Sequence, residues 1–302
     1  MSAATPELAP IILEAEEASG LWRDALRRLR RNPGAIAGIV LITLFILVGI
    51  LAPFLAPKSP THIDLTGLRP GFIPGPSRAH LLGLDDLGRD ELSRLIYGAR
   101  TSLLVGIVSL SIGGLSGVVL GALAGAAGGW VDAVIMRVMD MMLAIPGLLF
   151  AIAVAALLGR SLLSVMIAIG VVNVPIFARL LRGSMLSQRR SDYVLAARSV
   201  GVKPWRIVTG HMLPNSLGPV IVQATLALAT AIIDAAGLAF LGLGSQDPGV
   251  PEWGRMLAET QKFLEHAPQL ALFPGAAIVL SVLGFNLLGD GLRESLDPKL
   301  RR

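Results

Sequence analysis

Charged side chains inside long apolar stretches are the first residues of this sequence that could do chemistry. Asp140 and Asp234 each lie in such a stretch, and Arg137 stands one helical turn before Asp140. A carboxylate at membrane depth is costly and usually faces protein or a water-filled path. We therefore expect Asp140 to pair with Arg137. Asp234 has no local partner, so it faces either a water-filled path or a neighbouring helix.

Signatures of catalysis are missing from the sequence. It contains no GxxxxGK[ST] phosphate-binding loop and no GxSxG nucleophile turn. Its four histidines lack metal-ligand spacing, and there is no cysteine. We predict that the chain is not an enzyme and binds no metal or cofactor of its own. The basic pI, about 10.2, does not indicate nucleic acid, because the basic residues stand at the ends of apolar runs.

A polar segment late in the chain, Ser191–Asn215, is typical of a helix–turn–helix. Ser191 can cap the first helix, and Asp192 in its first turn is favourable against the helix dipole. Gly201 suits the left-handed residue that ends a helix, and Pro204 suits the first turn of the next one. An apolar side of such a hairpin could simply rest on lipid.

The elements that carry these residues are membrane helices. Hydrophobic residues make up 53% of the chain and charged residues 16%, and the mean hydropathy is +0.69, whereas soluble domains run near about 25% charged. A span needs about 20 mainly apolar residues. Six stretches qualify: Asn32–Pro57, Thr101–Val131, Met141–Gly159, Ser161–Ala178, Met212–Ile233 and Ala267–Gly289.

The basic residues set the orientation. With the N-terminus in the cytoplasm, the inside segments hold more than half of the 26 lysines and arginines. We therefore predict a multi-pass protein of the cell (inner or plasma) membrane with both termini cytoplasmic.

Glycines recur at every fourth position of the second span. Such spacing keeps them on one helix face, where another backbone can approach closely. We expect a tight helix contact, within the chain or across a dimer seam, at Gly113, Gly117, Gly121, Gly125 and Gly129.

The segment LAARSVG, followed by Ile207 and Leu213-Pro214, resembles the EAA loop of permease subunits of ATP-binding cassette (ABC) importers. In that family the loop forms coupling helices that sit in a groove of the ATPase subunit. Leu195 stands where the family has Glu, and Asp192 lies one turn earlier. The resemblance implies that contact with the ATPase subunit is made by residues of this coupling loop (191–210) and its flank. These are Asp192, Tyr193, Leu195, Ala196, Ala197, Gly201, Pro204, Ile207 and Pro214.

Three further segments resemble the C-type permeases for dipeptides, oligopeptides and nickel. They are His80–Leu103, Leu238–Leu257 and Phe285–Arg301, and the resemblance covers about residues 35–302. In the first segment, Asp85 could cap the next helix. Its i,i+4 pairs Asp85–Arg89 and Asp90–Arg94 are expected on a solvated helix face, where each is worth only a few tenths of a kcal/mol.

The resemblance implies an all-α membrane protein with six transmembrane helices and the type I ABC-importer permease fold. It divides the chain into a cytoplasmic tail (1–34), a first transmembrane helix (35–57), an extracytoplasmic loop with an amphipathic helix (58–98), a core of five transmembrane helices (99–290) and a cytoplasmic tail (291–302).

The resemblance also implies partners. These are a homologous second permease subunit in a heterodimer, two ATPase subunits at the cytoplasmic face and an extracytoplasmic solute-binding protein. ATP and Mg would bind to the ATPase subunits, and the lipid bilayer surrounds the spans. The implied function is import of di- or oligopeptides by alternating access. Nickel chelates or glutathione are alternative substrates. A different class of function is an ion-coupled carrier acting alone, with Asp140 and Asp234 as its proton or cation sites.

Overall fold

The computed structural model of the chain is a bundle of long helices, and it describes residues 26–65, 68 and 72–296. The predicted tails therefore lie partly outside the described residues. The helices are α2 (Pro33–Ile50), α3 (Ala52–Leu55), α4 (Glu91–Ala127), α5 (Gly129–Leu143), α6 (Gly147–Leu158), α7 (Leu162–Gln188), α8 (Asp192–Ser199), α9 (Pro204–Ile207), a π-helical turn (Val208–Met212), α10 (Leu213–Phe240), α11 (Trp253–Thr260), a 3-10 turn (Gln261–Phe263) and α12 (Gln269–Leu296).

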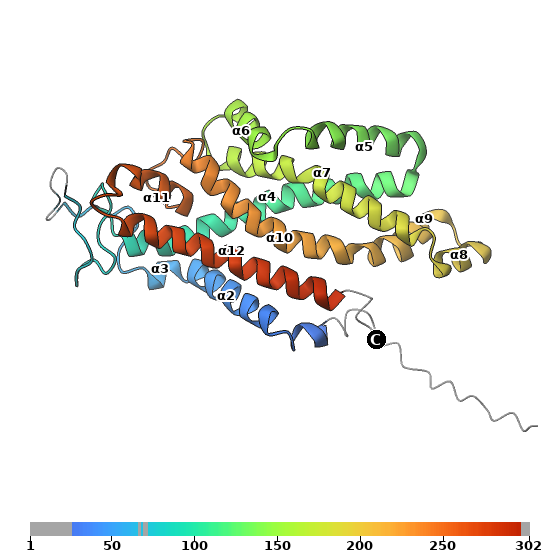
Figure 1. Cartoon of the computed structure of the whole chain (residues 1–302), viewed down its shortest axis with the longest axis horizontal. Coiled ribbons are helices and arrows are strands. Elements are labelled where there is room, and N and C mark those ends of the chain that lie inside the picture. The colour runs from blue at the N-terminus through green and yellow to red at the C-terminus, as the bar shows by residue number, and fades with distance from the viewer. Residues whose placement is uncertain (1–25, 66–67, 69–71, 297–302) are drawn as a thin grey trace, which may run out of the picture.

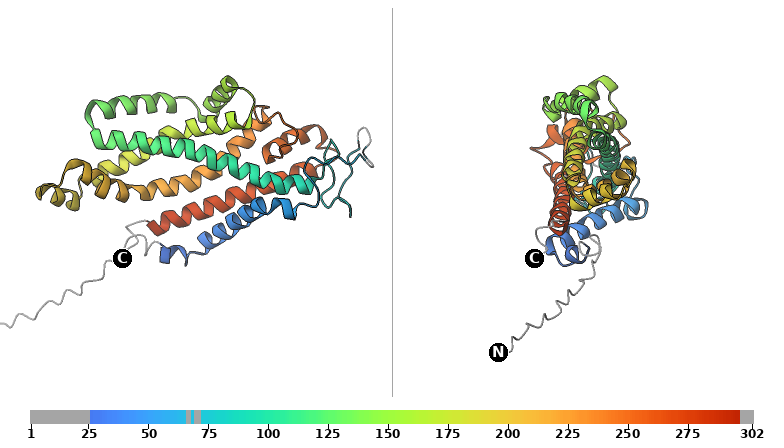
Figure 2. Two further views of the ribbon diagram at one scale, coloured as in Figure 1. Left: turned by 180° about the vertical axis from the view of Figure 1, so that it is seen from behind. Right: turned by 90° about the vertical axis from the view of Figure 1, so that its right-hand side faces the viewer.

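The long helices α2, α4, α7, α10 and α12 run along the same direction, as Figure 1 and the two views of Figure 2 show. The short helices α8 and α9 lie at one end of the bundle, and α11 lies at the other with the segment between α3 and α4. In the part of the chain that the structure describes, five helices are long and apolar enough to cross a membrane, and the bent pair α5–α6 makes a sixth span if the two halves count as one. This agrees with the predicted six spans.

Helices α4 and α7 pack closely along their length because α4 presents glycines to α7. A Cβ added at Gly117 would lie 2.5 Å from the Cβ of Phe177, and one at Gly121 would lie 2.5 Å from the carbonyl oxygen of Ala178. Gly113 and Gly125 face α7 in the same way. The contact is therefore within the chain.

Gly129 does not belong to this stripe. Helix α4 ends at Ala127, and Gly128 and Gly129 both have positive φ values, 64° and 57°, so the chain turns there into α5. Nothing lies within 4 Å of a Cβ built on Gly129. The expectation that Gly129 shares the packing face is wrong, because a helical period ends where the helix ends.

The start of α4 also differs from the expectation. Asp90 caps the helix by accepting from the Ser93 backbone N–H at 2.9 Å, so α4 begins at Glu91 rather than at Thr101. Asp85 is not the cap. Residues 91–98, expected to belong to a separate amphipathic helix, are the first turns of α4. At 37 residues, α4 is about 55 Å long, well beyond the roughly 30 Å hydrocarbon core.

The third expected span is broken. In place of one helix over Met141–Gly159, α5 and α6 meet at an angle of 92°. Pro146 precedes α6 and cannot continue the hydrogen bonding of α5. The chain then turns at Gly159, which has φ 89°, into α7.

The last helix runs past the expected end of the final span. Residues 291–296, predicted as tail, continue α12. Small residues hold this part against α2: a Cβ on Gly291 would clash with Ala35, and one on Gly38 would lie 2.8 Å from the carbonyl oxygen of Gly284. The backbones of α12 and α2 therefore approach each other closely here.

Candidate functional surfaces at the two ends of the bundle

The α8–α9 hairpin forms as its local sequence predicts. Gly201 has φ 77° and donates its N–H to the carbonyl of Arg198 at 3.0 Å, and the Val202 N–H reaches the carbonyl of Ala197 at 3.0 Å. These two bonds close the end of α8 in the Schellman pattern. Pro204 then opens α9. Ser191 precedes α8 as expected, but its hydroxyl donates to the carbonyl of Gln188 at 2.6 Å and does not cap the helix.

The inner side of the hairpin is fixed to the bundle. Val194 and Ile207 are buried, and they pack with Leu181 and Met185 of α7 and with Met212. Because apolar residues of α7, α8 and the turn into α10 share one cluster, a displacement of the hairpin must be felt by both long helices.

The hairpin exposes large apolar side chains, with charged residues such as Arg198, Lys203 and Arg206 also exposed around them. Leu195 is 48%, Val200 79% and Trp205 60% exposed. Asp192 is exposed one turn before Leu195 on α8, so an acidic group borders the apolar surface. The outward surface, here named the hairpin face, consists of Asp192, Leu195, Ala196, Val200, Pro204 and Trp205.

Of the other residues assigned to this loop, Tyr193 donates its hydroxyl to Gln188 Oε1 at 2.6 Å, and Ala197 packs on the buried side. Pro214 is exposed in the first turn of α10. It has no N–H to give to the preceding turn, which is π-helical.

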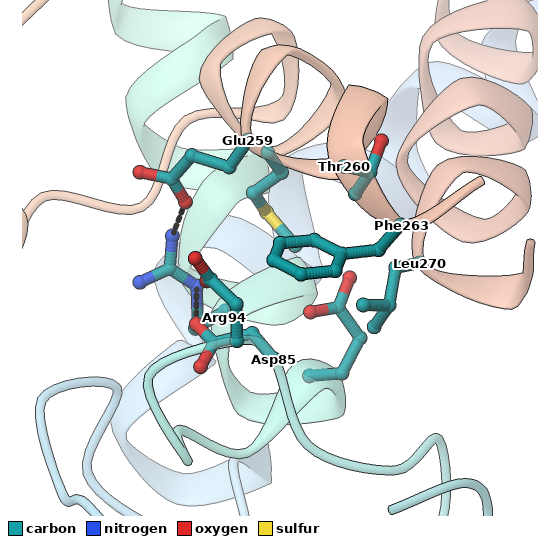
Figure 3. Close-up of a pocket in the computed structure, with 9 residues that line it drawn as sticks. Asp85, Arg94, Glu259, Thr260, Phe263 and Leu270 are labelled. Atoms are coloured by element: carbon teal, nitrogen blue, oxygen red, sulfur yellow. Dashed lines mark hydrogen bonds and ion pairs between the residues drawn. The ribbon is translucent and has the colours of Figure 1, made fainter. Parts of the chain in front are cut away.

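At the opposite end, ionised side chains are buried together. Arg89 Nε lies 2.6 Å from Asp85 Oδ2, and Arg94 Nε lies 3.3 Å from the same oxygen. Glu259 of α11 contacts both arginines, at 3.3 Å from Arg89 and 3.0 Å from Arg94, and Figure 3 shows Arg94 between Asp85 and Glu259. Arg255 adds a contact to Glu259 at 2.7 Å.

This ion-pair cluster (Asp85, Arg89, Arg94, Arg255 and Glu259) corrects the expectation of exposed helix pairs. Arg94 is 1% exposed and Arg89 2%. Asp90, expected to pair with Arg94, instead contacts His80 Nδ1 at 2.9 Å and caps α4. The sequence pattern could not reveal Glu259, which lies 165 residues from Arg94.

A small pocket adjoins the cluster. Asp86 and Glu91 line it, and burial followed by the nearby Asp85 charge raises the pKa of Asp86. Carboxylate oxygens of Asp85, Asp86 and Glu259 lie within 4.8 Å of one another, a spacing that suits a cation. Arg89 and Arg94 already neutralise two of these acids, so the arrangement is better explained as an ion-pair cluster.

Helix α11 is held onto α4 next to this cluster. Trp253, 1% exposed, donates its indole N–H to the carbonyl of Leu95 at 3.0 Å, and Gly98 leaves room for its ring. Glu252 caps α11 through the Gly254 N–H at 3.2 Å, and burial raises the pKa of its carboxyl to about 7. The segment after α10 is thereby anchored to the start of α4.

The charged residues expected in the spans lie differently from the prediction. Asp140 pairs with Arg179 of α7 at 3.6 Å, and not with Arg137. Within the described part of the chain, the Arg137 side chain has no ion pair, because it points outward from α5. Arg182 forms a two-pronged pair with Asp132, closing α5 against α7 near the hairpin. Asp234 is half-buried in α10 without a charged partner among the described residues.

Two family models match the chain. The binding-protein-dependent transport system inner membrane component matches residues 117–302, and the N-terminal TM domain of oligopeptide transport permease C matches residues 20–70.

Curated relatives match over most of their own length. The dipeptide transport system permease protein DppC of Alkalihalophilus pseudofirmus is 49% identical, over 93% of this chain and 90% of that protein. The glutathione transport system permease protein GsiD of Pectobacterium atrosepticum is 44% identical, over 93% and 92%. The di/tripeptide transport system permease protein DppC of Pseudomonas aeruginosa is 46% identical, over 89% of each.

Among solved structures, an inward-facing conformation of the MetNI methionine ABC transporter has a similar fold. The match has a TM-score of 0.56 at 18% identity, and it covers 68% of this chain and 96% of that chain.

Proposed function

This chain belongs to the family of binding-protein-dependent transport system inner membrane components, and on that premise we propose that it carries di- and oligopeptides across the cell membrane. The predicted family is confirmed, as is the predicted type I importer permease fold. The chain is a multi-pass membrane permease, and it is not itself an enzyme.

The observation that carries a coupled mechanism is the hairpin face. Its apolar side chains are exposed although Val194 and Ile207 anchor the same hairpin in the bundle. A surface that is apolar outside and rigidly connected inside suits a partner that pushes on it. We assign that partner to an ATPase subunit, with ATP and Mg bound there and with Asp192 supplying the acidic contact that Leu195 cannot make.

The hairpin end then faces the cytoplasm. Seven basic residues lie in the hairpin or shortly before it in the sequence, as the positive-inside rule requires of a cytoplasmic segment. They are Arg179, Arg182, Arg189, Arg190, Arg198, Lys203 and Arg206. The start of α2 and the end of α12 lie toward the same end of the bundle. The ion-pair cluster then faces outward, where a solute-binding protein would deliver substrate.

A second, homologous permease subunit completes the pathway, because five or six spans from one chain enclose only half of it. Two ATPase subunits then serve the pair. An ion-coupled carrier acting alone is disfavoured, since Asp140 is already paired with Arg179 and Asp234 stands alone.

The substrate class follows the relatives' names. Two of the three relatives quoted are dipeptide or di/tripeptide permeases, and one is a glutathione permease. Glutathione is itself a small peptide-like zwitterion, so it is the second candidate substrate. Nickel chelates have no supporting observation among these relatives.

Reconstitution tests the proposal. The chain, its second permease subunit, the ATPase subunits and the binding protein are placed in vesicles, and uptake of a labelled dipeptide is measured with and without ATP. We expect uptake that needs ATP and the binding protein. Uptake of glutathione but not of dipeptides would assign the second substrate, and uptake driven by an ion gradient by this chain alone would refute the proposal.

A further inference from the structure

A buried histidine connects the segment between α3 and α4 to the start of α4. This segment lies at the same end of the bundle as α11 (Figure 1), and His80 within it is 7% exposed. Its ring nitrogen Nδ1 is 2.9 Å from Asp90 Oδ1, and Nε2 is 3.2 Å from Asp64 Oδ2. Lys58 Nζ is 3.1 Å from the same Nε2 and 3.9 Å from Asp64 Oδ2. We name these four residues, Lys58, Asp64, His80 and Asp90, the His80 latch.

The His80 latch joins pieces of backbone that lie apart in the sequence. Lys58 and Asp64 follow α3, whereas Asp90 is the N-cap of α4. The Lys58 backbone N–H donates to Ser93 Oγ at 3.1 Å, and the Ser93 hydroxyl donates to Asp90 Oδ2 at 2.7 Å. A change at the His80 ring therefore acts on the segment 58–64 and on the cap of α4 together.

The protons on the His80 ring decide which contacts the latch makes. A neutral imidazole donates from one nitrogen only, whereas an imidazolium donates from both. Because each nitrogen faces a carboxylate oxygen, only the imidazolium donates to Asp64 and Asp90 at once. A neutral ring that keeps its bond to Asp90 accepts at Nε2 from Lys58 Nζ instead. Asp64 then loses the donor that His80 supplied.

Charge balance separates the same two states. Lys58 and an imidazolium balance the carboxylates of Asp64 and Asp90, whereas a neutral ring leaves one negative charge in excess. Asp90 is 2% exposed, so water does little to compensate that charge. Asp90 keeps the Ser93 backbone N–H and hydroxyl as donors in both states. The contact that weakens is therefore the one between His80 and Asp64.

We propose that the His80 latch is a pH-sensitive switch, which holds the segment 58–64 on the start of α4 when His80 is protonated and releases it when His80 is neutral. Histidine changes its charge between about pH 5 and 8, so the latch opens as the pH rises through this range. Arg89 and Arg94, which contact Glu259 of α11, lie on either side of the cap. An open latch therefore loosens the end of α4 that holds α11, and transport slows. That this end meets the external pH rests on the orientation given under the proposed function.

Hydrogen exchange of the assembled importer in detergent, measured by mass spectrometry, tests the latch itself. Two amides of the peptide 58–65 report on it: Lys58, which donates to Ser93 Oγ, and Asp64, which donates to the carbonyl of Gly88 at 2.7 Å. After correction for the intrinsic rate, their exchange should be about tenfold faster at about pH 8 than at about pH 6. Tenfold is about the effect of losing one hydrogen bond to a charged group. His80→Gln should show the fast rate at both pH values.

Two further variants keep this test specific. His62→Gln is the matched control, because His62 is exposed two residues before Asp64, and it should keep the wild-type change with pH. Asp64→Asn preserves the size of the side chain and removes its charge, so the change with pH should be largely lost. A corrected wild-type rate that is equal at both pH values, or a change that persists in His80→Gln, would overturn the proposal.

Uptake by vesicles tests the effect on transport. The internal pH is fixed, and the binding protein and the pH are set outside. Uptake of a labelled dipeptide should be slower at an external pH of about 8 than of about 6 in the wild type and in His62→Gln, and His80→Gln should lose this difference. The same pH dependence in His80→Gln would overturn the role in transport. Failure of the wild-type importer to take up any dipeptide would refute the proposed function instead, and the exchange rates would still decide the latch.

Discussion

Substitution of Gly201 tests whether the hairpin transmits movement between the ATPase subunit and the spans. Gly201 has φ 77°, and nothing lies within 4 Å of a Cβ built on it. A side chain there meets no neighbour, so its whole effect is backbone strain. A left-handed conformation costs a residue with a side chain about 1–2 kcal/mol, which shifts the local equilibrium of the hairpin by a factor of about 5–30.

The strain should depend on the residue introduced. Asparagine tolerates positive φ better than alanine, and a β-branched residue tolerates it least. We therefore expect the loss of coupling to increase from Gly201→Asn through Gly201→Ala to Gly201→Val. Gly183→Ala is the matched control, because Gly183 is an exposed glycine inside α7 with no strained φ and open space around it.

The assay measures peptide uptake and ATP hydrolysis in the same vesicles. The number of peptides imported per ATP should fall about fivefold or more in Gly201→Val and should not change in Gly183→Ala. The amount of ATPase subunit that copurifies with each variant separates lost docking from lost transmission. An unchanged transport ratio in Gly201→Val, with normal docking, would refute the assignment of this hairpin.

Three other substitutions probe stability in detergent by thermal unfolding. Gly121→Ala should destabilise the chain by about 1–3 kcal/mol through overpacking against Ala178; an unchanged melting temperature would contradict the close α4–α7 contact. Arg94→Ala should cost about 3–5 kcal/mol by leaving buried acids such as Asp85 less compensated, and a loss below 1 kcal/mol would show that the cluster is solvated. Glu252 has a pKa raised from 4.5 to about 7 in the folded chain, so its protonated form favours folding. Stability should therefore fall as pH rises from about 4.5 through 7, by at most about 1.4 kcal/mol per pH unit, and Glu252→Gln should flatten that part of the profile.

Local sequence was sufficient for much of the hairpin and for the spans. Gly201 and Pro204 act within a few residues of their own positions. A glycine in the left-handed conformation ends a helix, and a proline without an N–H suits the first turn of the next one. The glycines from Gly113 to Gly125 mark one face of a helix by their period alone. The period does not show where the helix ends, so the expectation that Gly129 shares this face is wrong.

Only the tertiary structure decided which charges meet. Asp140 has Arg137 one turn away on its own helix, yet it pairs with Arg179 of α7 because the two helices face each other at that level. Arg94 and Glu259 are brought together when α11 folds onto α4, and this burial turns apparent surface charges into a buried cluster. Composition and spacing thus determine that this chain crosses the membrane and where the α8–α9 hairpin turns. Contacts between distant segments, which spacing along one helix does not encode, determine which of its charged groups are buried, paired or exposed.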